Sequence, residues 1–69
     1  MKLSELTELK KQHLAWRLDH NTSCGYLTAI SIAKGELGDL DLIEIFKKFG
    51  GRSDHSAKIL ARKVMNFTL

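Results

Sequence analysis

Four stretches of this chain repeat apolar side chains every three to four residues, and short segments containing Gly or Asn separate them. This spacing is typical of an α-helix buried along one face, whereas a half-buried strand alternates at every second residue. The sequence contains no proline, which agrees with helices joined by tight turns. We therefore predict an all-α fold, a compact four-helix domain over residues 1–69 with short glycine-containing turns.

The first predicted helix spans residues 4–19, with Ser4 as its N-cap and acidic residues in its first turns, where the helix dipole favours them. The second begins at residue 22 or 23 and ends at 33 or 34. It carries no charge before Lys34, so we expect it to be the most buried element, with Leu27 on its inward face and Ile32 outside that face. Its β-branched residues make a strand the competing interpretation.

The third and fourth predicted helices have clearer ends. The third spans about 39–49, with Asp41 and Glu44 at the spacing of a capping box, and ends at the glycine pair 50–51. The fourth begins after Ser53, a good N-cap, and continues to about residue 66. Its expected inward face consists of Ala57, Leu60, Ala61, Val64 and Phe67.

A chain of 69 residues has a small core, and its single cysteine, Cys24, excludes an internal disulfide. Small domains commonly gain the stability that a small core does not provide by self-association, so we expect a homodimer. One cysteine also indicates a reducing compartment. The sequence shows neither the apolar core of a signal peptide nor a membrane-spanning run. We therefore expect a cytoplasmic protein.

The positive charge of the chain is concentrated at its C-terminal end. Residues 1–20 sum to +1 and residues 21–50 to −1, whereas residues 51–69 sum to +3 because four cations outweigh Asp54. A positive face on a small domain indicates an anionic partner, most commonly nucleic acid. The apolar face of the last helix is needed for the core, so we expect no membrane partner.

The segment 42–66 has the layout of a helix-turn-helix, with a helix, a glycine turn and a basic helix. Two features depart from that motif: Phe46 stands where a small residue is usual, and the turn is slightly long. The leading prediction is a DNA-binding transcription regulator, helix-turn-helix-like in its last two helices. The predicted nucleic-acid-binding residues are Arg52, Ser53, His55 and Lys58 facing the bases, with Arg62 and Lys63 on phosphates.

The first helix provides an alternative function through protein–protein contact. Its apolar arc is broader than a small core needs, and Trp and Arg are typical anchors at protein interfaces. The chain would then be an adaptor or inhibitor, and ordinary packing on the neighbouring helices is the simpler explanation of the arc. The predicted partner or dimer interface is Leu6, Leu9, His13, Trp16 and Arg17.

Two further constellations point to chemistry but do not match known spacings. His13, His20, Cys24 and His55 form a chemically reasonable zinc set, yet no zinc motif has this spacing, so we predict no metal and no cofactor. Cys24, expected in the first turn of the second helix, can be drawn as a nucleophile with His20. The chain is too small to build a substrate pocket alone, so we predict no catalytic residue, no small-molecule substrate and no enzyme.

Overall fold

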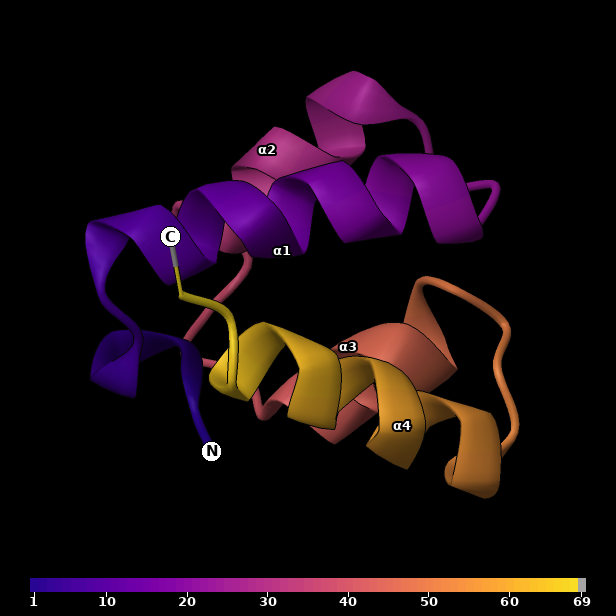
Figure 1. Ribbon diagram of the computed structural model, residues 1–69. Coiled ribbons are helices and arrows are strands. Elements are labelled where there is room, and N and C mark those ends of the chain that lie inside the picture. Colours follow the sequence, from indigo (N-terminus) through magenta and orange to yellow (C-terminus); the bar gives the residue numbers. More distant parts are fainter. Residues whose placement is uncertain (69) are drawn as a thin grey trace.

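The computed structural model describes residues 1–68 and contains four α-helices, with no strand among these residues (Figure 1). They are α1 (Glu8–Asn21), α2 (Tyr26–Ala33), α3 (Leu42–Lys48) and α4 (Asp54–Met65), preceded by a 3-10 turn, η1 (Leu3–Glu5). The predicted all-α four-helix fold is confirmed. No helix in the described part of the chain is long and apolar enough to cross a membrane.

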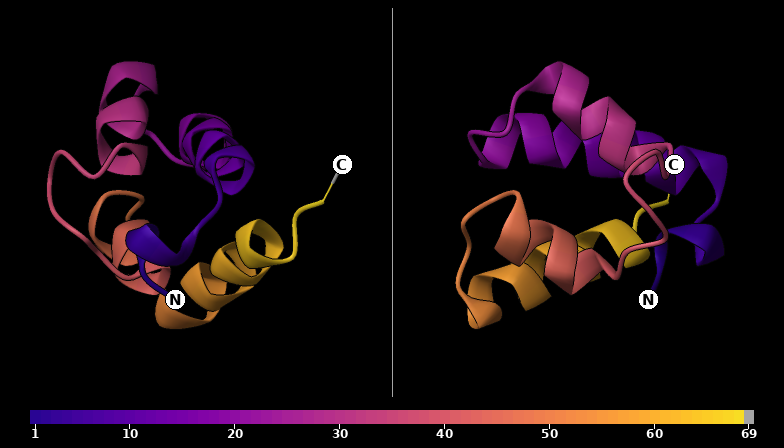
Figure 2. Two further views of the ribbon diagram at one scale, coloured as in Figure 1. Left: turned by 90° about the vertical axis from the view of Figure 1, so that its left-hand side faces the viewer. Right: turned by 180° about the vertical axis from the view of Figure 1, so that it is seen from behind.

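The helices form two layers, with α1 packed on α2 and α3 packed on α4 (Figure 2). In each layer the second helix runs back alongside the first, and α1 also contacts α4 (Figure 1). Phe46 is fully buried between the layers. The buried face of α4 includes two small residues, Ala57 and Ala61.

The first helix begins later than predicted, and Ser4 is not its cap. The Ser4 backbone N–H and hydroxyl both donate to the Asp39 carboxylate, each at 2.9 Å. These bonds hold the pKa of Asp39 below its ordinary value. Thr7 caps α1 by accepting the backbone N–H of Lys10 at 3.3 Å. Ser4 therefore joins η1 to the segment before α3, an attachment 35 residues away in the chain.

The second helix is shorter than predicted and its buried face is different. It begins at Tyr26 after Gly25, whose φ of 88° favours glycine. Ile32 is fully buried with Ala29 and Ala33, whereas Leu27 is 80% exposed. The predicted inward Leu27 and outward Ile32 are therefore both wrong, and α2 is not the most buried element.

The predicted caps of the last two helices are confirmed. Asp41 caps α3 by accepting the Ile43 N–H at 2.9 Å, and Ser53 caps α4 by accepting the Ser56 N–H at 3.3 Å. Between them, Gly50 lies where a Cβ would be 2.6 Å from the Phe46 carbonyl oxygen and 2.7 Å from a Thr22 methyl carbon. The end of α1 thus meets the end of α3 at Gly50, where the two layers approach most tightly.

Candidate functional site

Segment 41–69, which contains α3 and α4, holds the whole charge excess of the chain. It has six lysines and arginines against three acids, for a net charge of +3, whereas segment 1–40 has five of each and is neutral. The outward side of α4 carries His55, Lys58 and Arg62, all exposed and spaced three and four residues apart. Lys63 is also exposed, and Arg52 in the preceding turn is half-buried. Helical spacing therefore aligns His55, Lys58 and Arg62 in one row, with Lys63 and Arg52 outside it.

One acid interrupts this basic surface. The Asp54 carboxylate is 3.1 Å from Nζ of Lys58 and 3.6 Å from Nζ of Lys47, and Lys58 is the main cause of its lowered pKa. All three side chains are well exposed, so these ion pairs are weak and easily exchanged for another anion. Among residues 1–68, Arg62 and Lys63 have no ion pair. The sequence interpretation missed the Asp54–Lys58 pair, although its i,i+4 spacing is a recognisable signal.

The predicted interface on α1 is divided between core and surface. Leu6 is buried at 6% exposure, and Leu9, His13 and Arg17 are half-buried. Trp16 is 49% exposed and is the one of the five that presents a large apolar surface to solvent.

The chain after α4 packs back onto α1 through aromatic rings. Phe67 stacks on His13 with ring centroids 3.9 Å apart, and Trp16 lies against His13 at 5.8 Å and His20 at 4.5 Å. Arg17 Nε donates to Nε2 of His13 at 2.8 Å, so this nitrogen carries no proton. Burial, and then the charge of Arg17, lower the pKa of His13. Phe67, predicted on the inward face of the last helix, instead lies beyond the end of α4 and stacks on α1, while Leu69 lies outside the described residues.

A groove of about 620 Å³ runs between α1 and α2. Its floor and walls include Ala15, Trp16, Tyr26 and Ile30. Glu8, Lys11 and Lys34 lie toward one end, and Asp19 and His20 toward the other, because the two helices run in opposite directions (Figure 1). No sequence pattern indicated this groove, since it depends on how α2 is rotated against α1.

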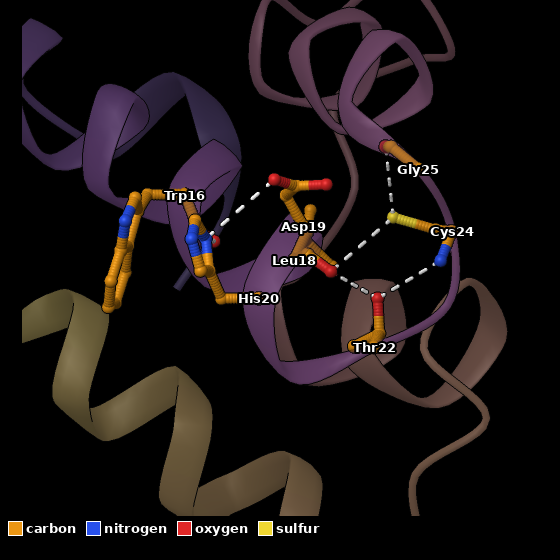
Figure 3. Close-up of polar contacts among 7 residues, drawn as sticks. All are labelled: Trp16, Leu18, Asp19, His20, Thr22, Cys24 and Gly25. Atoms are coloured by element: carbon orange, nitrogen blue, oxygen red, sulfur yellow. Dashed lines mark hydrogen bonds and ion pairs between the residues drawn. The ribbon is translucent and has the colours of Figure 1, made fainter.

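Cys24 precedes α2 and does not lie in its first turn, which corrects the predicted position (Figure 3). Its Sγ is 3.7 Å from the Leu18 carbonyl oxygen and 3.6 Å from that of Gly25. His20 Nδ1 instead lies 3.0 Å from the Trp16 carbonyl oxygen and 3.7 Å from Asp19 Oδ2. Among residues 1–68, no three His, Cys, Asp or Glu side chains converge as metal ligands.

Neither a family model, nor a curated protein, nor a solved structure matches this chain. Its function must therefore be inferred from its own charge, exposed side chains and surface shape.

Proposed function

We propose that this chain is a small non-enzymatic regulator that binds duplex DNA through α4, acting as a homodimer in the cytoplasm. One observation supports the DNA proposal above the others: the charge excess of +3 lies in segment 41–69, and α4 presents a row of that segment's cations to solvent. The proposed compartment depends on the single cysteine, which is typical of reducing environments.

The dimensions of α4 suit the major groove of DNA. A helix with its side chains is about 10–12 Å in diameter, and the major groove is about 12 Å wide and admits one helix. The row from His55 to Arg62 covers about 10 Å along the helix axis. In this proposal the N-terminal end of α4 enters the groove, so Arg52, Ser53 and His55 reach base edges. Lys58 then exchanges its weak contact with Asp54 for a contact with the DNA, and Arg62 and Lys63 contact phosphates.

Fluorescence anisotropy with a labelled duplex of mixed sequence tests this proposal. Affinity should fall with rising salt, because each neutralised phosphate releases counterions. In the double variant Lys58→Glu, Arg62→Glu the slope of log K against log salt should lose about two units. The matched control is Lys2→Glu, Lys10→Glu, which reaches the same net charge through segment 1–40 and should keep most of the affinity. No binding at 50 mM salt by the folded wild type, or equal losses in both variants, would contradict the proposal.

A second candidate function is the protein–protein adaptor, which the half-exposed Trp16 beside the groove favours. It differs from the first in the surface used, since it needs α1 and not α4. A wild type that binds no duplex and is monomeric in solution would favour this second function, because the groove would then be free for a different protein.

A further inference from the structure

The groove between α1 and α2 has a self-complementary character, and we infer that a second copy of this chain binds there about a two-fold axis. The inference rests on the proposed function only for the expectation of a dimer. Its test is made without DNA, so the two proposals can fail separately.

Large apolar side chains are exposed on this face, which favours its burial in a protein interface. Tyr26 on α2 is 59% exposed, and Trp16 across the groove on α1 is 49% exposed. Leu27 follows Tyr26 and is 80% exposed, but it does not line the groove. Large apolar side chains grouped at a groove are typical of an interaction site, whereas scattered ones need no explanation. Aromatic side chains are also enriched in the centres of protein interfaces.

The charges at the two ends of the groove are opposite in sign. Glu8, Lys11 and Lys34 give one end a net charge of +1. The acidic side chain of Asp19 lies at the other end and gives it a formal charge of −1 from acids, lysines and arginines. A two-fold axis through the middle of the groove, near Ala15 and Ile30, places the positive end of one copy against the negative end of the other. Both ends are then paired at once, which is the property that a symmetric interface requires.

The surface area of the molecule is large enough for a dimer interface on this face. A stable dimer buries about 800 Å² on each partner, and the whole chain exposes 4233 Å². Such an interface covers about a fifth of the surface of each copy. The α3–α4 layer lies on the other side of the molecule (Figure 2). Each copy therefore keeps α4 uncovered.

Sedimentation velocity of the purified chain from 10 to 500 µM tests the contact. We expect the wild type to dimerise and Tyr26→Asp, which places a charge in the groove, to weaken dimerisation at least tenfold. Ile59→Asp is the matched control, because it adds the same charge at a 42% exposed apolar position on α4 and should leave dimerisation unchanged. A monomeric wild type at 500 µM, or a Tyr26→Asp variant that dimerises like the wild type, overturns the inference.

A charge exchange tests the two-fold arrangement itself. Lys34→Glu makes both ends of the groove negative, and Asp19→Lys makes both ends positive, so each variant alone should remain monomeric. Mixed in equal amounts, the two should form a heterodimer, because every contact then joins opposite charges. Mixtures that show no more association than either variant alone would exclude this pairing of the groove ends.

Discussion

The α1–α2 layer and the α3–α4 layer differ in what they present to solvent. The first belongs to a neutral segment and exposes Trp16 and Tyr26 at a groove, with Leu27 also exposed on α2. The second belongs to a segment of charge +3 and exposes Lys47, Lys48, Lys58, Arg62 and Lys63, and within residues 41–68 Ile59 is its one exposed large apolar side chain. A chain of 69 residues can thus build two chemically distinct faces by assigning one to each helix pair.

The largest expected effect is at Gly50, where the layers meet. Gly50→Ala places a Cβ 2.6 Å from the carbonyl oxygen of Phe46 in α3 and 2.7 Å from the Thr22 methyl carbon, so the backbone at the end of α3 and the Thr22 side chain must shift. We expect a loss of about 1–3 kcal/mol in the free energy of unfolding, measured by urea denaturation. Adding Thr22→Ser, which removes that methyl group, should recover part of the lost free energy of unfolding. A Gly50→Ala variant as stable as the wild type would show that the layers are not held this closely.

Local signals predicted the elements that depend on near neighbours. The caps Asp41 and Ser53 each bond a backbone N–H two or three residues ahead, so the sequence reveals them. Ser4 has a similar local pattern, but its partner Asp39 is 35 residues away and overrides it. In α2, only eight residues define the apolar phase, and nearly all of them are apolar or small, so periodicity does not distinguish Ile32 from Leu27.

A smaller effect concerns the contact of the tail with α1. His13 accepts a hydrogen bond from Arg17 and stacks on Phe67, so the folded state favours the neutral ring and the pKa of His13 is lowered. The unfolded chain takes up a proton first as the pH falls below about 6.5. Stability should therefore decrease from pH 7 toward pH 5.

Urea denaturation at several pH values measures this dependence. His13→Phe keeps a ring against Phe67 but does not titrate, so it should reduce the decrease between pH 7 and pH 5. His55→Gln is the control on exposed α4 and should behave as the wild type. If the stability of the His13→Phe variant depends on pH as strongly as that of the wild type, His13 does not cause the pH dependence.

The smallest expected effect on stability is at Asp54, which interrupts the basic row. Asp54→Asn removes exposed ion pairs and an acid in the first turn of α4, so we expect only a small loss of stability in urea denaturation. Under the proposed function, the same change should raise duplex affinity several-fold at low salt, because Lys58 and Lys47 lose their competing carboxylate. Unchanged or weaker binding by the folded variant in the anisotropy assay would argue against phosphate contacts by these lysines.

The sequence predicts the row on α4 but not the groove, because only the row depends on residues close together in the chain. The row of cations on α4 follows from helical spacing within one element, so its residues were found in the sequence. The groove depends on the rotation of α2 against α1, and the stacking of Phe67 on His13 joins residues 54 positions apart. Such contacts between distant elements leave no pattern in a single sequence.

The most direct test of the central claim, that the two layers have separate partners, is a titration of the ¹⁵N-labelled chain with duplex DNA followed by NMR. At constant protein concentration and low salt, we expect the backbone amide signals of residues 52–63 to shift and those of residues 26–34 to stay in place. Shifts concentrated in residues 26–34, or no shift anywhere with DNA in excess, would contradict the account.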